Sequence, residues 1–259
     1  MASGILVASA TAEAERHVGD IWIFIIIGFF AQLVDGALGM AFGVISTSAL
    51  LTFGVAPASA SAMTHVAEIF TTAASGASHA YHRNINWKLV ARLAPAGMIG
   101  GVVGAYLLSN IDGKMIEPFV SAYLIGVGIF ILFKAFRPLW PRDVHDRIVP
   151  AVGLGGGLLD SMGGGGWGPI VTTSLVGRGH EPRKVIGSTS VTEFLVTLTI
   201  SATFVLTLGW TDLSNAVGLI IGGVVAAPLG AFVVKKLPTR PLMIGVAVII
   251  IATSIYRFF

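Results

Sequence analysis

Four carboxylic acids lie inside apolar stretches of this sequence, and their spacing could serve the binding of a proton or another ion. They are Asp35, Glu68, Asp160 and Glu193, whereas the other nine of the 13 acids lie in tails, loops or the ends of apolar segments. An acid at the centre of a bilayer costs about 2.5–3.5 kcal/mol on insertion scales. That cost indicates a function, so we expect these four acids and His65 to form the proton-coupling or ion-coupling part of a site.

Each of these side chains also has a purely structural explanation. Asp35 and Asp160 could each cap a following helix by accepting hydrogen bonds from its free N–H groups. Glu68 and Glu193 could be buried acids that bond to a neighbouring helix. His65 precedes Glu68 by three residues and shares its helix face, but it could equally be a hydrogen-bonded core residue.

Glycine-rich stretches surround the two aspartates: VDGALGMAFG at residues 34–43 and LDSMGGGGWG at residues 159–168. Glycine lets a ligand approach the backbone closely, and free N–H groups at the start of a helix bind anions. The alternative is a close helix crossing, which also favours glycine. For a small anionic substrate, we expect the binding residues to be Gly36, Gly39, Phe42, Gly43, Thr64, Gly163, Gly164, Gly165, Gly166, Trp167, Ser188, Thr189 and Ser190.

The composition indicates an all-α integral membrane protein. The 259 residues are 54% hydrophobic and 11% charged, with a mean hydropathy of +0.86, whereas average soluble domains carry roughly 25% charged residues. The chain has no cysteine, which excludes disulfides and thiolate metal sites. Its histidines are scattered, so we expect neither a metal site nor a cofactor.

Eight apolar segments follow a short polar tail at residues 1–19. They cover about residues 20–54, 57–81, 89–109, 116–136, 148–177, 185–209, 214–234 and 241–257. A straight helix over residues 20–54 would be about 50 Å long, far more than the roughly 30 Å hydrocarbon core. We therefore expect residues 20–54 and 148–177 to form broken hairpins with tips at 35–43 and 160–168. Whether their limbs span the membrane or re-enter it stays open.

The two halves of the chain are repeats. A shift of 125 residues gives 12 identities over positions 33–68, and it places Asp35 on Asp160 and Glu68 on Glu193. The sequence predicts repeat 1 at residues 20–137, a polar cytoplasmic linker at 138–147 and repeat 2 at 148–259. Internal repeats are common in secondary transporters.

The basic residues predict the topology. If both broken segments return to their starting side, 13 Lys and Arg lie on one side of the membrane and 3 on the other. The positive-inside rule expects such a bias, which places both termini outside the cytoplasm. Each repeat is then a broken hairpin plus three transmembrane helices, and the second repeat is inverted. Irregular backbone at membrane depth must be buried or line a cavity, so we expect the two tips to meet.

At these residues the sequence resembles the TauE/SafE family of sulfite-exporter-like permeases. The resemblance rests on the two halves, the two glycine-rich stretches and the Thr-x-Val-x-Glu that follows each, at 64–68 and 189–193. It implies a substrate such as sulfite, a sulfonate or another small organosulfur anion. It adds no catalytic motif, so the expected site residues rest on the repeat.

The sequence therefore favours a proton-coupled secondary transporter of small sulfur-containing anions in the cell (inner) membrane, working by alternating access around the two tips. A passive anion channel, or a permease for another small organic anion, is the alternative. A structural subunit would leave the paired acids unexplained.

We do not expect an enzyme, because no Gly-x-Ser-x-Gly nucleophile motif is present. The basic face is expected to meet anionic lipid rather than nucleic acid, and the oligomeric state stays open.

Overall fold

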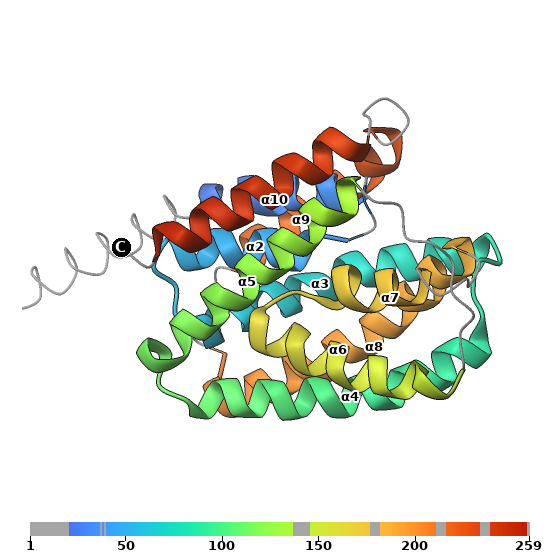
Figure 1. Cartoon of the computed structure of the whole chain (residues 1–259), viewed down its shortest axis with the longest axis horizontal. Helices are drawn as coiled ribbons and strands as arrows, with labels where there is room; N and C mark the ends of the chain where they lie inside the picture. Colours follow the sequence, from blue (N-terminus) through green and yellow to red (C-terminus); the bar gives the residue numbers. More distant parts are fainter. Residues whose placement is uncertain are drawn as a thin grey trace, which may run out of the picture.

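The computed structural model describes residues 21–36, 38, 40–136, 146–176, 182–210, 216–233 and 239–257. Within these residues all regular structure is helical (Figure 1), which confirms the predicted all-α class. The N-terminal tail, most of the linker and Gly39 lie outside the described residues.

The helices follow the same order in both halves of the sequence. The first half contains the helix Ile21–Gly36, α2 (Phe42–Thr52), α3 (Pro57–Tyr81), α4 (Trp87–Asn110) and α5 (Gly113–Phe136). After the short 3-10 turn η1 (Asp146–Ile148), the second half contains α6 (Val149–Gly163), the π-helical turn η2 (Trp167–Thr172), α7 (Thr173–Val176), α8 (Pro182–Leu208), α9 (Ala216–Val233) and α10 (Thr239–Tyr256). The inverted relation of the two halves stays a prediction.

Three described helices are long and apolar enough to cross a membrane: Trp87–Asn110, Gly113–Phe136 and Arg183–Leu208. Shorter apolar helices cover Ile21–Gly36, Phe42–Thr52, Ala216–Ala227 and Arg240–Tyr256. Many large apolar side chains on α4, α5, α9 and α10 are exposed, as expected for helices that face lipid. The structure is therefore that of a multi-pass membrane protein.

Both long apolar segments are broken at the predicted places. The first is interrupted at Met40 and Ala41, before Phe42, and the second between Gly163 and Trp167. At 1.5 Å per residue, the 15 residues of α6 extend about 23 Å, less than the roughly 30 Å hydrocarbon core. In Figure 1, α6 begins at the right-hand end and α7 returns toward it. The length of α6 therefore favours a re-entrant limb in the second hairpin, and the placement of the other limbs in the membrane stays a prediction.

Backbone conformation explains the second break. Gly164 has φ of 66° and Gly165 has φ of 146°, values that side chains with a Cβ rarely adopt. Gly166 (φ 174°, ψ −13°) precedes η2, and the equivalent residue Ala41 (φ 156°, ψ −6°) precedes α2. The two breaks therefore share a backbone conformation at the residue before the second limb.

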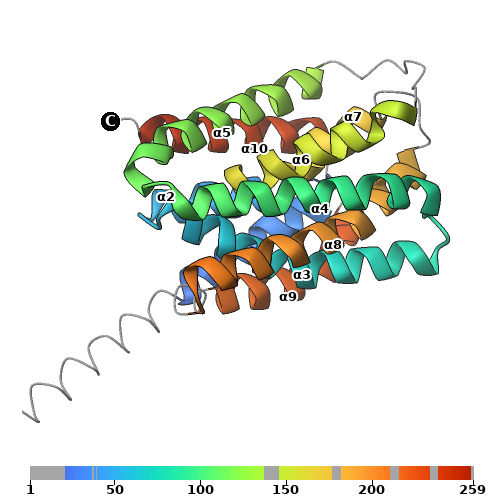
Figure 2. The ribbon, with the colours of Figure 1, turned by 90° about the horizontal axis from the view of Figure 1, so that it is seen from below.

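Glycines on other helices permit close packing. Figures 1 and 2 show α4 beside α6, and a Cβ on Gly157 of α6 would lie 2.9 Å from Gly101 N. The helix 21–36 approaches α9 equally closely, since a Cβ on Gly222 would lie 2.6 Å from Phe29 N. Small residues of this kind let membrane helices approach each other, and here they allow α6 to pack against α4 and the helix 21–36 to pack against α9.

Candidate functional site

The two hairpin tips meet backbone to backbone. A Cβ added to Gly43 would lie 2.6 Å from Gly165 Cα and 2.8 Å from Glu68 Oε1. A Cβ on Gly164 would overlap the side chain of Thr47, whose hydroxyl donates a hydrogen bond to Gly164 O. The predicted meeting of the tips is therefore seen in the structure, and it requires glycine because no room is left for a side chain.

Each aspartate caps the limb that follows its tip. Asp35 Oδ1 accepts a hydrogen bond from Phe42 N at 3.2 Å, and Asp160 Oδ1 accepts one from Trp167 N at 2.9 Å. These are equivalent positions of the two repeats, and each bond spans seven residues across the break. The structural alternative given for the aspartates is thus present, and Asp160 Oδ2 also lies 3.3 Å from His65 Nε2.

The threonines near the tips also form an equivalent pair of contacts. Thr47 Oγ1 lies 3.0 Å from Thr64 Oγ1, and Thr172 Oγ1 donates to Thr189 Oγ1 at 3.0 Å. Each bond joins the second limb of a hairpin to the long helix that follows it. The repeat found in the sequence therefore extends to hydrogen bonds in the structure.

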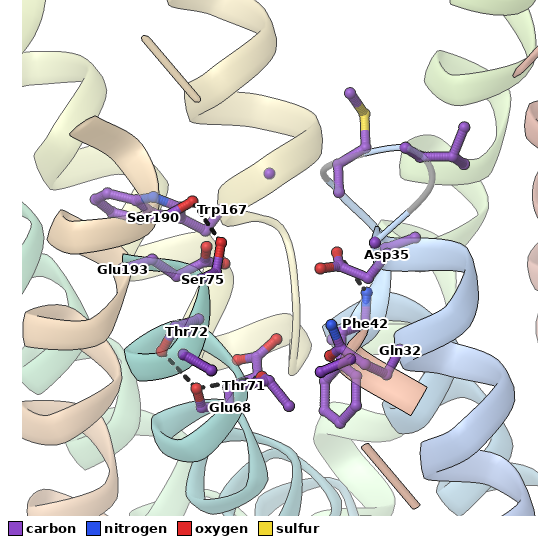
Figure 3. Close-up of a pocket in the computed structure, with 18 of the residues that line it drawn as sticks. Gln32, Asp35, Phe42, Glu68, Thr71, Thr72, Ser75, Trp167, Ser190 and Glu193 are labelled. Atoms are coloured by element: carbon purple, nitrogen blue, oxygen red, sulfur yellow. Dashed lines mark hydrogen bonds between the residues drawn. The ribbon is translucent and has the colours of Figure 1, made fainter. Parts of the chain in front are cut away.

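A cavity of about 720 Å³ lies against the two tips (Figure 3). Figure 3 shows Asp35 and Gln32 on one side of it, and Glu68, Ser75, Ser190 and Glu193 on the other. Nine of the expected site residues line this cavity: Asp35, Gly36, Phe42, Gly43, Glu68, Gly166, Trp167, Ser190 and Glu193.

Eight expected site residues do not line the cavity: Thr64, His65, Asp160, Gly163, Gly164, Gly165, Ser188 and Thr189. They are buried, and their polar groups are used within the protein. Ser188, for example, accepts from Asn86 N and donates to Lys184 O. Their hydroxyl groups and amides hold the tips and helices together. The set of site residues expected from the sequence is therefore larger than the set that lines this cavity.

Glu68 occupies the centre of the arrangement. This residue lines the cavity and is 4% exposed, with Oε1 close to Gly43 and Oε2 without a hydrogen-bond partner. Gln32 Oε1 is the other unpartnered buried atom among the described cavity residues. Buried polar atoms normally have partners, so these two are suited to a bound water, ion or substrate.

Several lining residues were not expected from the sequence. Thr71, Thr72 and Ser75 follow Glu68 by three, four and seven residues, and these spacings place them on one helix face. Gln32 precedes Asp35 by three residues in the same way. Helical periodicity counted from each acid would have found them, whereas the repeat alone does not.

The cavity reaches the surface at one end of the molecule. Its lining runs along α3 from Glu68 to Ser78, which is exposed, and to His79. Just beyond, Lys184 Nζ donates to Arg83 O at 2.6 Å. Arg83 and Lys184 make this the basic end of the molecule.

Two further basic side chains, both near the ends of helices, bind equivalent positions of the hairpins. Lys134 Nζ donates to Thr173 Oγ1 at 2.5 Å and approaches Met40 Sδ at 3.6 Å. Arg257 Nη1 donates to Ser48 O at 3.0 Å, and Ser48 is the repeat equivalent of Thr173. Neither contact was expected from the sequence, because both depend on tertiary packing.

The sequence matches the sulfite exporter TauE/SafE family over residues 24–257. A probable membrane transporter protein, YtnM, of Bacillus subtilis (strain 168) is 40% identical over 236 residues, which cover 87% of this chain and 78% of the relative. A probable membrane transporter protein of Haemophilus influenzae (strain ATCC 51907 / DSM 11121 / KW20 / Rd) is 23% identical over 262 residues, or 92% of this chain and 98% of the relative. No solved structure matches the chain.

Proposed function

The chain belongs to the sulfite exporter TauE/SafE family of membrane transporters, and from this premise we propose that it carries small sulfur-containing anions, such as sulfite or a sulfonate, together with protons. The observation that supports this most is the cavity, where both hairpin tips and three carboxylic acids converge.

The backbone of the tips supplies hydrogen-bond donors for an anion. Gly43 and Val44 line the cavity at the first turn of α2, where N–H groups have no partner within the helix. The partial positive charge of a helix N-terminus also favours an anion. Gly166 and Gly168 bring the start of the second hairpin limb to the same cavity, so the substrate would lie between the two tips.

The acids explain why protons would accompany the anion. Asp35, Glu68 and Glu193 line the cavity, and no Lys or Arg occurs among its described lining residues. Two like charges 4 Å apart repel by about 4 kcal/mol at an effective dielectric constant of 20. A proton bound to a carboxylate removes this repulsion, so proton binding and anion binding would favour each other.

The shape of the cavity favours a transporter over a passive channel. On α3 the lining ends at Glu68 and does not continue toward Pro57. On that side of Glu68, the side chains of Thr64, His65 and Ser61 are buried. Among the described residues of α3, the lining therefore reaches the surface at Ser78 and stops at Glu68, as expected for one state of an alternating-access cycle. With the basic end in the cytoplasm of the cell (inner) membrane, this state faces inward.

Sulfite flux into proteoliposomes tests this function, with and without an imposed pH gradient and against protein-free liposomes. The proposal predicts that the gradient drives sulfite accumulation. Sulfite flux that ignores the gradient would contradict proton coupling and favour a channel. Absence of sulfite flux, with flux of a sulfonate or a carboxylate instead, would contradict sulfite as the substrate and leave coupling to be tested on that anion.

A further inference from the structure

We propose that His65, Glu68 and Asp160 hold the coupling proton as one unit, while their repeat equivalents Ser190, Glu193 and Asp35 face the substrate. This division of roles rests on the proposed function, because it assigns the proton to one of two repeat-related groups of side chains and the anion to the other. His65 is the residue that distinguishes the halves, since only its half carries an imidazole at this position.

The geometry joins the three side chains of the first group. His65 is fully buried on α3 and packs near the ring of Phe204. Its Nε2 lies 3.3 Å from Asp160 Oδ2 and 4.0 Å from Glu68 Oε2. The imidazole thus bridges an acid that faces the cavity and an acid that caps the second hairpin limb.

The hydrogen bonds around Ser61 determine which ring nitrogen of His65 carries a permanent proton. Ser61 Oγ donates to Ser161 O at 2.6 Å, so its hydroxyl proton is not available to His65. His65 Nδ1 lies 2.8 Å from Ser61 O and 3.2 Å from Ser61 Oγ. A carbonyl oxygen only accepts, and therefore Nδ1–H is the donor.

Nε2 is then the nitrogen that can gain or lose a proton. Its 3.3 Å contact with Asp160 Oδ2 requires a proton between the two atoms. That proton is either on Nε2, giving an imidazolium beside a carboxylate, or on Asp160, giving a carboxylic acid beside a neutral ring. Asp160 Oδ1 accepts a hydrogen bond from Trp167 N. The position of this proton therefore sets the charge of the carboxyl group that caps the second limb of the second hairpin.

Glu68 connects this buried unit to the cavity. Its Oε2 has no hydrogen-bond partner and can take a proton from cavity water. When the shared proton is on Asp160, a water that bridges the 4.0 Å between Oε2 and Nε2 can carry the Glu68 proton to Nε2. This leaves a Glu68 carboxylate and an imidazolium beside Asp160, which keeps its own proton, and the reverse transfer returns the proton to the cavity. Nδ1–H stays bonded to Ser61 O in both states, so no other bond to the ring has to break.

The repeat-equivalent group is arranged differently. Asp35, Ser190 and Glu193 all line the cavity, whereas His65 and Asp160 do not. Ser190 Oγ donates to Ile186 O at 2.9 Å and accepts from Ser75 Oγ at 3.3 Å. A serine hydroxyl does not titrate in the physiological range, so this position offers a ligand a polar surface without storing a proton.

Other titratable groups face the proton-holding unit. Glu193 on α8 and Asp35 on the helix 21–36 interact electrostatically with Glu68. Tyr123 on α5 interacts with Asp160, and its hydroxyl donates to Gly165 O. A proton on the unit therefore lowers the negative charge that both the cavity acids and an incoming anion experience.

The variant His65→Gln tests the role of the imidazole in transport, because glutamine keeps a polar side chain but cannot titrate. We expect it to lose gradient-driven sulfite accumulation while it keeps sulfite exchange at equal pH. His82→Gln is the matched control, since His82 Nδ1 also bonds the carbonyl four residues earlier, at 2.8 Å, but is exposed. Accumulation by His65→Gln equal to that of His82→Gln would overturn the proposal.

Nitrogen NMR of histidine-labelled protein tests the same unit without transport. We expect one histidine, absent from the spectrum of His65→Gln, to keep Nδ1 protonated while Nε2 gains a proton as the pH falls. In Glu68→Gln this step should occur at a different pH. A His65 signal with an unprotonated Nδ1, or an Nε2 whose state never changes, would overturn the proposal even if wild-type transport is proton-coupled. If wild-type flux ignores the gradient and the NMR result is as expected, the proposed function fails and the proton unit stands.

His65→Ser provides a second variant if His65→Gln does not fold, because it introduces the residue that the other half already tolerates. It should show the same loss of gradient-driven accumulation and the same missing NMR signal. Retention of gradient-driven accumulation would overturn the proposal in this variant too.

Discussion

Replacement of Gly165 by alanine should strongly destabilise the protein by forcing the two hairpin tips apart. The added Cβ would lie 2.6 Å from Gly43 Cα and closer still to Gly43 C and Val44 N. These are backbone atoms, so no side chain can rotate away. The φ of 146° at Gly165 is also unfavourable for any residue with a Cβ.

The two effects set the size of the change. An unfavourable φ of this kind costs on the order of 1–3 kcal/mol, and an extra methyl group in a tightly packed site costs about 1–3 kcal/mol more. Since 1 kcal/mol lowers the midpoint of thermal unfolding by about 2–4 °C in a chain of this size, Gly165→Ala should lower it by on the order of 10 °C.

Thermal unfolding of the purified protein in detergent, followed by tryptophan fluorescence, measures this change. Gly155→Ala is the control, because a Cβ there meets nothing within 4 Å and alanine favours a helix over glycine by about 0.5–1 kcal/mol. Gly155→Ala should unfold at or slightly above the wild-type midpoint. A Gly165→Ala midpoint equal to that of Gly155→Ala would refute the contact between the tips.

Three further predictions concern bonds at the hairpins. Asp160→Ala removes the acceptor for Trp167 N, whereas Asp160→Asn retains one, so the alanine variant should be less stable by about 1 kcal/mol in thermal unfolding; equal stabilities would argue against a cap. Thr172→Val loses the bond to Thr189 and should cost about 1 kcal/mol without changing the affinity for sulfite, because Thr172 does not line the cavity. Arg257→Met removes the bonds to Ser48 O and to the hydroxyls of Ser121 and Ser254 and should lower the unfolding midpoint; an unchanged midpoint would show that these bonds contribute nothing.

The sequence predicted the helices and the breaks because both depend on local features. Apolar length specified the long helices, and the glycine-rich stretches specified where residues 20–54 and 148–177 are interrupted. The repeat paired Asp35 with Asp160, and the structure adds that both cap the following limb. The long helices and the two breaks follow from the length of the apolar segments and from the position of the glycines, without knowledge of tertiary contacts.

The composition of the cavity was harder to predict because it depends on which neighbour each polar group meets. Thr64 and Ser188 were expected at the site, but their hydroxyls are bonded to Thr47 and Asn86 instead. His79 was not among the expected site residues, yet it lines the cavity. Lys134 reaches Thr173 across a gap of 39 residues in sequence, which no local pattern specifies.

Cysteine labelling at Ser75 tests most directly whether the cavity between the tips binds the substrate. The chain has no cysteine of its own, so Ser75→Cys and Tyr81→Cys each carry a single thiol. Ser75 lines the cavity, whereas Tyr81 is 85% exposed at the end of α3 and does not. The account predicts that a membrane-impermeant thiol reagent labels both from the cytoplasmic side and that sulfite slows labelling of Ser75→Cys alone. Labelling of Ser75→Cys that sulfite does not slow, at concentrations that saturate transport, would contradict it.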